Sequence, residues 1–327
     1  MSLDRRQVIA AGLAGAGVAA SATPGDAAQT VAPPDPTEVL RLWPGAAPGG
    51  ERVTVTPVVV ERSTDPAYRD RFAQYTTDPL LTVVRPARPN GASLLLIPGG
   101  GYRWAVVDKE GLDVARVFAA AGVTCYVLRY RLPADGWAAG PDAPLQDAQR
   151  ALRLVRARAA AEGLDPARVA VLGASAGGHL AGLLAARTDA TYAAVDSTDA
   201  LPHRPDLTVL LYPVVTLTDP FAHAGSRTQL LGPEPTEAAI AAWSLEQMDW
   251  RGAAPTILIH ALDDAPVPPE NSLKLLQSLR RGAVAAEAHL FQEGGHGFGV
   301  RLIVGRPAEA WPELVLAFGR RQGWLRA

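Results

Sequence analysis

A strand, a tight glycine turn and a helix follow one another around Ser175. Residues 169–172 (Val-Ala-Val-Leu) have the composition of a buried strand, and residues 178–184 continue as a helix-like apolar run. Between them stands Gly-Ala-Ser-Ala-Gly at residues 173–177. Only small residues fit beside a serine in so tight a turn, which holds the hydroxyl clear of the sheet at the N-terminus of the helix. The pattern predicts an α/β fold with Ser175 as a nucleophile.

Partners for such a nucleophile follow later in the chain. Residues 255–260 indicate a buried strand that leads to two acids, Asp263 and Asp264. Residues 288–291 indicate another strand, which leads into a glycine-rich loop around His296. Serine, acid and histidine in this chain order match a triad in which the histidine takes the serine proton and the acid orients the imidazole. On these grounds both acids remain candidates.

A second glycine turn provides backbone donors. Residues 93–97 form an apolar strand, and Pro-Gly-Gly-Gly-Tyr follows at residues 98–102. Glycines let backbone N–H groups turn toward a substrate carbonyl, and with the N–H of Ala176 they could stabilise a tetrahedral anion. The alternatives are a plain turn and a phosphate-binding loop, the second of which is disfavoured because no Lys-Ser/Thr pair follows.

These segments resemble those of the α/β-hydrolase carbohydrate esterases. The group includes acetylxylan-esterase-like and feruloyl-esterase-like bacterial enzymes, some of which are labelled xylanases. The resemblance extends from about residue 40 to residue 325 and is carried by Leu42–Gly49, Pro98–Tyr102, Gly173–Ala181, Asp264–Pro268 and Gly294–Phe298.

The resemblance implies an α/β-hydrolase fold: a mostly parallel, eight-stranded sheet with helices on both faces and a small cap. It implies Asp264 as the triad acid, because the Asp-x-x-Val-Pro spacing matches, with Asp263 as its neighbour. By analogy the oxyanion donors are Gly100, Gly101 and Ala176, and neither a cofactor nor a metal is needed. One departure is Pro98, where many lipases and esterases have a histidine.

The alternation of strand-like and helix-like segments predicts one domain over residues 39–327. Residues 218–252 hold the least regular sequence and are expected to form a small cap over the edge of the active site. The amphipathic pattern is clearest at residues 145–162. Strands are expected near residues 53–60, 80–85, 93–97, 123–129, 168–173, 207–213, 254–260 and 286–291. Helices are expected near residues 110–121, 145–162, 175–187, 270–281 and 308–322.

Composition agrees with one large globular domain and excludes several classes of protein. The chain has 327 residues, of which 48% are hydrophobic, and a net charge of −2 without a basic run, so nothing indicates a nucleic-acid partner. Cys125 is the single cysteine, so no internal disulfide can form. The six histidines show no metal-ligand spacing.

The N-terminus resembles a twin-arginine signal. Arg5 and Arg6 precede a weakly apolar stretch that is too short for a confident membrane span, and a cleavage site is expected near residue 22. Residues 1–22 are therefore predicted to be a signal peptide, and residues 23–38 a linker. These features predict an exported, periplasmic protein whose mature form has no membrane span.

Several further residues are candidates for the site or its surroundings. Four aromatic residues on segments expected at the carboxyl edge of the sheet could line a substrate rim, or simply pack there: Tyr102, Trp104, Trp137 and Tyr212. His179 and His260 are interpreted as packed residues. Glu110 is interpreted as the start of a helix.

The sequence and the resemblance together predict a serine esterase that removes short acyl groups, most of all acetyl, from a carbohydrate through an acyl-enzyme on Ser175. Its expected partner is a small-molecule or oligosaccharide ester substrate. A general carboxylesterase or a serine peptidase would use the same residues. A non-catalytic binding protein is disfavoured because every catalytic part is present. A glycosidase is disfavoured because it requires two opposed carboxylates, whereas the acids here lie together in one loop.

Overall fold

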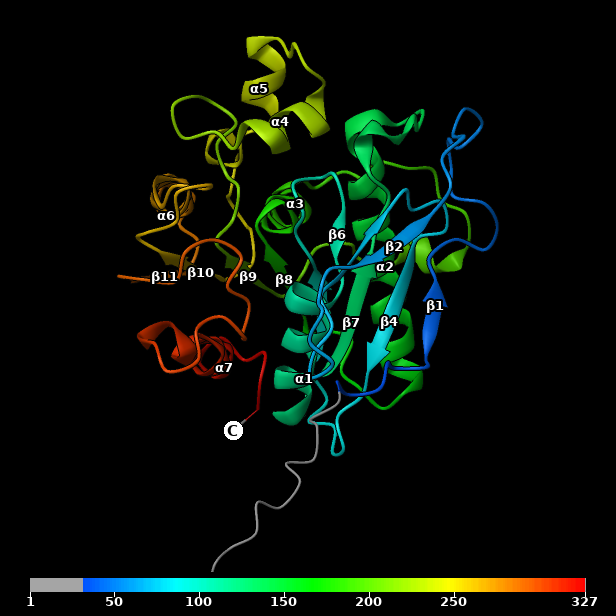
Figure 1. The fold of residues 1–327 in the computed structure, drawn as a ribbon. Coiled ribbons are helices and arrows are strands. Elements are labelled where there is room, and N and C mark those ends of the chain that lie inside the picture. Colours follow the sequence, from blue (N-terminus) through cyan, green and yellow to red (C-terminus); the bar gives the residue numbers. More distant parts are fainter. Residues whose placement is uncertain (1–31, 327) are drawn as a thin grey trace, which may run out of the picture.

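The computed structural model describes residues 32–326. Its centre is an eight-stranded sheet in the order β1-β4-β7-β5-β8-β9-β10-β11 (Figure 1). All neighbouring pairs from β7 to β11 are parallel, whereas β4 is antiparallel to both of its neighbours. The strands are β1 (Val39–Arg41), β4 (Leu80–Val84), β5 (Ser93–Ile97), β7 (Thr124–Arg129), β8 (Val169–Ala174), β9 (Leu207–Leu211), β10 (Thr256–Ala261) and β11 (Ala286–Phe291).

The central strands are buried because helices cover both faces of the sheet. Every residue of β5, β8, β9 and β10 is buried, as expected for parallel strands with nearly continuous apolar sequences. Successive side chains of β5 point to opposite faces. Leu95 and Ile97 therefore join one hydrophobic core, and Leu94 and Leu96 join the other.

Helices form the two outer layers. One core contains side chains of α2 (Ala143–Ala161), α3 (Ala176–Ala186) and α6 (Glu270–Arg281). The opposite core contains those of α1 (Asp113–Ala120) and α7 (Trp311–Arg321), and Figure 1 shows α1 in front of the sheet and α2 behind it. This arrangement confirms the predicted mostly parallel sheet with helices on both faces. Short helical turns complete the chain: η1 (Asp108–Leu112), η2 (Pro133–Asp135), η3 (Gly140–Asp142), η4 (Ser197–Ala200), η5 (Leu245–Gln247) and η6 (Pro307–Ala310).

The prediction of a strand near residues 53–60 is wrong both in its length and in the sheet to which it belongs. Only β2 (Val58–Glu61) forms there, and it belongs to a second sheet with β3 (Arg71–Gln74) and β6 (Ala105–Val106). Pro57 has no N–H to donate to a ladder, and β2 is largely exposed. The eighth strand of the main sheet is β1, whose three residues are too few to give a pattern.

The predicted cap, residues 218–252, contains α4 (Ala224–Leu231) and α5 (Glu237–Trp243), which Figure 1 shows projecting together from the sheet. Both helices begin at a side-chain cap. The N–H of Ser226 donates to His223 Nδ1 at 3.1 Å at the start of α4, and Thr236 caps α5 in the same way. The cap therefore has well-defined local structure.

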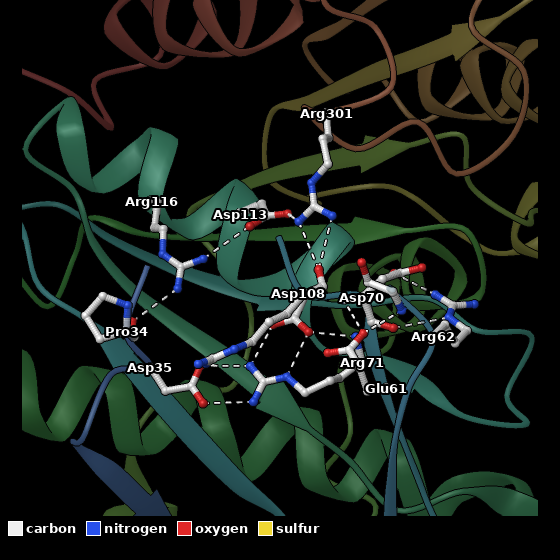
Figure 2. A network of polar contacts seen from close by, with 12 residues as sticks. Pro34, Asp35, Glu61, Arg62, Asp70, Arg71, Asp108, Asp113, Arg116 and Arg301 are labelled. Atoms are coloured by element: carbon white, nitrogen blue, oxygen red, sulfur yellow. Dashed lines mark hydrogen bonds and ion pairs between the residues drawn. The ribbon is translucent and has the colours of Figure 1, made fainter. Parts of the chain in front are cut away.

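Ion pairs bind the chain before β1 to the domain. Arg71 donates to Asp35 at 2.8 Å and to Asp108 at 2.7 Å (Figure 2). Residues 32–38, the end of the predicted linker, are thus held against the folded chain, whereas the signal peptide predicted at residues 1–22 lies outside the described residues. In the described part of the chain, no helix is both long enough and apolar enough to cross a bilayer.

Candidate active site

Ser175 stands on a strained turn between β8 and α3. Its backbone has φ 54° and ψ −122°, a conformation that residues other than glycine rarely adopt. The flanking glycines have no room for a side chain. A Cβ on Gly173 would lie 2.2 Å from the carbonyl oxygen of Gly177, and one on Gly177 would lie 2.1 Å from that of Ile97. The glycines in the motif therefore reflect a steric requirement of the turn.

Ser175, His296 and Asp264 form a continuous hydrogen-bonded chain. Ser175 Oγ is 2.8 Å from His296 Nε2, and His296 Nδ1 is 2.7 Å from Asp264 Oδ2. When Nδ1–H donates to the carboxylate, Nε2 can accept the serine proton. The three residues follow β8, β10 and β11, whose carboxyl ends meet at one edge because these strands run parallel.

The Asp264 carboxylate is held in a buried position. The residue is 3% exposed, Oδ1 accepts the N–H of Val267 at 2.9 Å, and Oδ2 lies 3.3 Å from His260 Nε2. Burial by itself would raise the pKa of Asp264, but hydrogen bonds from His260 and His296 hold that pKa below its ordinary value. The carboxylate is therefore charged at neutral pH and fixed toward the imidazole.

Asp263 is directed to another part of the site. We use the name histidine loop for residues 292–299, which carry His296. Asp263 Oδ1 accepts the backbone N–H of Gly295 in this loop at 2.8 Å, and the residue remains exposed. Asp264 therefore contacts the imidazole of His296, whereas Asp263 contacts the backbone of the loop that carries this histidine.

The oxyanion turn, Gly99–Gly101, lies beside Ser175. Gly100 and Gly101 have φ of 129° and 65°, and a Cβ on Gly100 would lie 2.2 Å from the carbonyl oxygen of Trp104. Within residues 32–326 the N–H groups of Gly100, Gly101 and Ala176 have no hydrogen-bond acceptor. The three donors that the family resemblance assigns to the oxyanion hole are therefore available to a substrate carbonyl.

Glu110 is a buried carboxylate that sequence reasoning did not place in the site. It lies in η1 and is 3% exposed. Oε2 accepts the N–H of Gly99 at 2.8 Å, and Oε1 accepts the hydroxyl proton of Tyr212 at 3.0 Å. The Tyr212 hydroxyl oxygen accepts the N–H of Gly299 at 3.1 Å. Glu110 thus connects the oxyanion turn to the histidine loop.

Two of the four aromatic residues predicted for the substrate rim, Tyr102 and Tyr212, are fully buried. Tyr102 has a positive φ of 59°, and its hydroxyl lies inside the protein, 2.8 Å from His179 Nδ1. His179 Nε2 lies 2.7 Å from the Trp243 carbonyl oxygen, and burial lowers the pKa of His179 to about 4. The Tyr212 ring packs against His296, with centroids 5.1 Å apart. Neither tyrosine forms an exposed rim.

Trp137 also departs from the prediction, whereas Trp104 borders the site. Trp137 is 6% exposed, and its ring lies against the buried Arg131 guanidinium, 4.7 Å from the ring centroid. A Cβ on Gly50 would meet the same ring at 2.9 Å, so Trp137 fills the interior. Trp104 lies in the wall of the cavity over Ser175.

The cavity over Ser175 and His296 is open and has a volume of about 600 Å³, a size typical of small-molecule sites. The oxyanion turn, η1, the histidine loop and the cap contribute to its walls. Sequence reasoning expected the cap but named none of its contact residues. The remaining lining residues are Arg62, Arg103, Val106, Lys109, His223, Ala224, Gly225, Thr228, Gln229 and Gly297.

Known proteins share this architecture. The BD-FAE family model matches residues 86–279, which is more than half of the chain. Among solved structures, the acetyl ester-xyloside bifunctional hydrolase from Caldicellulosiruptor lactoaceticus is 30% identical, with a TM-score of 0.66. That match covers 88% of this chain and 97% of the solved chain.

The curated relatives are longer proteins. An endo-1,4-beta-xylanase B from Butyrivibrio fibrisolvens is 32% identical over 63% of this chain and 32% of its own length. An acetylxylan esterase from Xylanibacter ruminicola is 28% identical over 65% of this chain and 42% of its own length. The chain thus spans less than half the length of either relative. It belongs to the BD-FAE family of α/β-hydrolase carbohydrate esterases.

Proposed function

We propose that the protein is a serine esterase that removes short acyl groups, most of all acetyl, from a carbohydrate. The observation that carries the proposal is the hydrogen-bonded chain from Ser175 through His296 to Asp264 beneath an open cavity. Relatives named as an acetylxylan esterase and as an acetyl ester-xyloside hydrolase support a carbohydrate ester as the substrate.

In the first half of the proposed reaction, Ser175 Oγ attacks the ester carbonyl carbon while His296 Nε2 takes the hydroxyl proton. The carbonyl oxygen becomes an anion that accepts hydrogen bonds from the oxyanion turn and from the N–H of Ala176. One such donor typically lowers the barrier by about 2.7–4 kcal/mol. His296 then gives the proton to the leaving sugar oxygen, and the acetyl group remains on Ser175.

In the second half, a water molecule takes the place of the sugar. His296 accepts a proton from this water as it attacks the acyl carbon, and the proton then returns to Ser175 as acetate leaves. Asp264 acts in both halves by keeping Nδ1 protonated and by stabilising the imidazolium. Its burial and its two further contacts, with Val267 and His260, keep the carboxylate in position for that role.

A general carboxylesterase or a serine peptidase would use the same three residues. The choice among these enzyme classes therefore depends on which substrate the cavity can hold. The cavity is open, and the cap lines it with polar side chains such as His223, Thr228 and Gln229. Because the cavity is open to solvent, it would not enclose a long acyl chain along its length. This lining favours a short acyl group and a polar alcohol.

Acetyl esters of 4-nitrophenol should therefore be hydrolysed with a kcat/KM roughly tenfold or more above that of the octanoyl ester. The reason is that the additional methylene groups gain no closed apolar channel in this cavity. Initial rates over a series of acyl lengths measure the preference, with Ser175→Ala as the blank. A preference for octanoyl or longer chains would instead identify a general carboxylesterase.

Replacing Glu110 with glutamine should lower kcat roughly 5- to 100-fold on 4-nitrophenyl acetate, with a smaller change in KM. The two hydrogen bonds use different oxygens of the carboxylate, and in glutamine an NH₂ group, which cannot accept, replaces one of these oxygens. The exposed Glu293 of the histidine loop supplies the control, Glu293→Gln, which should behave as the parent enzyme. A folded Glu110→Gln enzyme with unchanged kcat would show that the carboxylate does not position the turn.

A further inference from the structure

The cavity wall is more basic than the chain as a whole. Arg62, Arg103 and Lys109 line it, and Glu110 is the one acidic residue in its lining, whereas the chain has a net charge of −2. The Glu110 carboxylate is occupied by Gly99 and Tyr212. Each basic side chain can bind an anionic ligand only if no neighbouring carboxylate already pairs with it.

Lys109 lies along the histidine loop. Its Nζ is 3.3 Å from the position that a Cβ on Gly297 would occupy, and its Cγ is 3.4 Å from the corresponding position on Gly299. The missing side chain of Gly297 thus leaves room for the ammonium group directly after His296. Among residues 32–326, no carboxylate lies within 4.0 Å of Lys109 Nζ, so the ammonium group forms no ion pair. The nearest carboxylate in the cavity lining is that of Glu110, whose Oε1 lies 3.5 Å from the same position beside Gly297.

Arg103 is a second cation in the lining of the cavity. The residue is exposed, and its guanidinium lies 5.2 Å from the centroid of the Trp104 ring. Arg103 forms no ion pair with another described residue. Arg62 differs, because its Nη2 lies 2.8 Å from Asp70 (Figure 2). Lys109 and Arg103 are therefore the two cations of the wall whose charge is available to a ligand.

The position of Lys109 identifies the part of the substrate that its charge would meet. In the proposed reaction His296 Nε2 protonates the leaving oxygen, so the leaving group must lie beside the imidazole. The ammonium group of Lys109 stands next to the following residue, Gly297. It can therefore interact with a substituent of the leaving alcohol. An ammonium is a compact point charge that binds a carboxylate without demanding a bidentate geometry.

We infer that the preferred leaving group is a sugar that carries a carboxylate, as a uronic acid does, and that Lys109 binds this carboxylate with Arg103 as the second cation of the cavity wall. This inference rests on the proposed function, because it identifies the alcohol half of the same ester. The charges lie in an open cavity, where ion pairs are modest in strength and sensitive to salt. The expected preference for a charged substrate is accordingly moderate.

The test compares two matched substrates, an acetylated methyl glucuronoside and its uncharged uronamide. The acid should have a kcat/KM roughly three- to tenfold above that of the amide at low ionic strength. The ratio should fall toward one as salt is added, because screening shortens the range of the interaction. A ratio at or below one at low salt, with both sugars deacetylated, would overturn the inference and leave the proposed esterase activity intact.

Variants of the two cations show which side chains produce the preference for the charged substrate. Lys109→Gln and Arg103→Gln should each lower the acid-to-amide ratio, and the double variant should bring it close to one. Lys274→Gln is the matched control, because Lys274 is the other lysine of the chain, lies on α6 and does not line the cavity. Arg103 is exposed, so its variant remains informative even if Lys109→Gln fails to fold. An unchanged ratio in a folded double variant would contradict the assignment.

Inhibition separates failure of this inference from failure of the proposed function. The unacetylated methyl glucuronoside should inhibit hydrolysis of 4-nitrophenyl acetate roughly three- to tenfold more tightly than its uronamide. Tighter inhibition by the acid would support the carboxylate site even if the enzyme hydrolysed neither acetylated sugar. Failure to hydrolyse both sugars would reject only the proposed sugar esterase activity. Equal inhibition, or a charge preference confined to anionic acyl groups such as hemisuccinate, would overturn the leaving-group assignment.

Discussion

Replacing Ser175 with alanine should lower kcat on 4-nitrophenyl acetate by about 10⁶-fold, the loss seen when a serine hydrolase loses its nucleophile. The variant keeps the turn, because alanine needs no more space than serine, but it removes the hydroxyl oxygen that is proposed to carry the acyl group. Initial rates measure the loss. A circular dichroism spectrum and a Tm close to those of the parent would show that the fold is retained.

Ser226 supplies a demanding control for this experiment. Its Oγ lies 2.8 Å from His223 Nδ1, a separation equal to that between Ser175 and His296, and His223 lines the same cavity. Ser226 lies within α4, however, and not on a strained turn after a strand. Ser226→Ala should keep most of the activity, and an organophosphonate should label Ser175. A label on Ser226 would reassign the nucleophile.

Replacing Asp264 with asparagine should lower kcat by about 10⁴-fold with little change in KM. The amide can donate to His296 Nδ1, which would leave the proton on Nε2 and prevent that nitrogen from accepting the proton of Ser175. The Asp264 contacts with Val267 and His260 would also change. Steady-state kinetics on 4-nitrophenyl acetate measure both constants.

Asp263→Asn is the matched comparison, because the two acids are neighbours in one loop. Asp263 is exposed, and its contact is with the backbone of Gly295 and not with the imidazole. An asparagine oxygen can still accept that N–H, so the loss should be below about tenfold. If Asp263→Asn were the more damaging substitution while both proteins remained folded, the acid of the triad would have to be reassigned.

Local sequence predicts those parts of the fold and the site that neighbouring residues determine. The turn around Ser175 depends on Gly173 and Gly177, whose missing side chains are required by backbone atoms within a few ångströms. The central strands are buried on both faces, so their apolar runs reveal them directly. Serine, acid and histidine each follow a strand of one parallel sheet, and this brings their three loops to the same edge.

The sequence does not predict the positions of residues that depend on contacts between distant segments. Trp137 looked like a rim residue, but it packs against Arg131, which is itself buried beside Asp147. Tyr102, also predicted for the rim, has a positive φ of 59°, and its hydroxyl lies inside the protein beside His179. Sequence spacing could not foresee either outcome, because both depend on contacts between separate elements of the fold.

Glu110 shows the same limit for a polar residue. An acid near the start of a helix is common, so its sequence position indicated a local role. The structure instead directs its carboxylate to Gly99 and Tyr212, which are separated from it by 11 and 102 residues. One local signal was present: Gly111 follows Glu110, and a Cβ there would lie only 2.8 Å from Val127. A glycine needed for such close packing can mark a segment that lies against the core.

The proposed esterase activity on a carbohydrate can be measured as acyl release from acetylated xylooligosaccharides. The purified enzyme is incubated with these oligosaccharides and, in parallel, with feruloylated ones, and Ser175→Ala serves as the blank. We expect rapid release of acetate, slower release of ferulate, and neither from the variant. Acetate release that persists in Ser175→Ala would contradict the proposed nucleophile. If the parent enzyme hydrolyses 4-nitrophenyl acetate but releases no acetate from the sugars, the carbohydrate assignment is wrong.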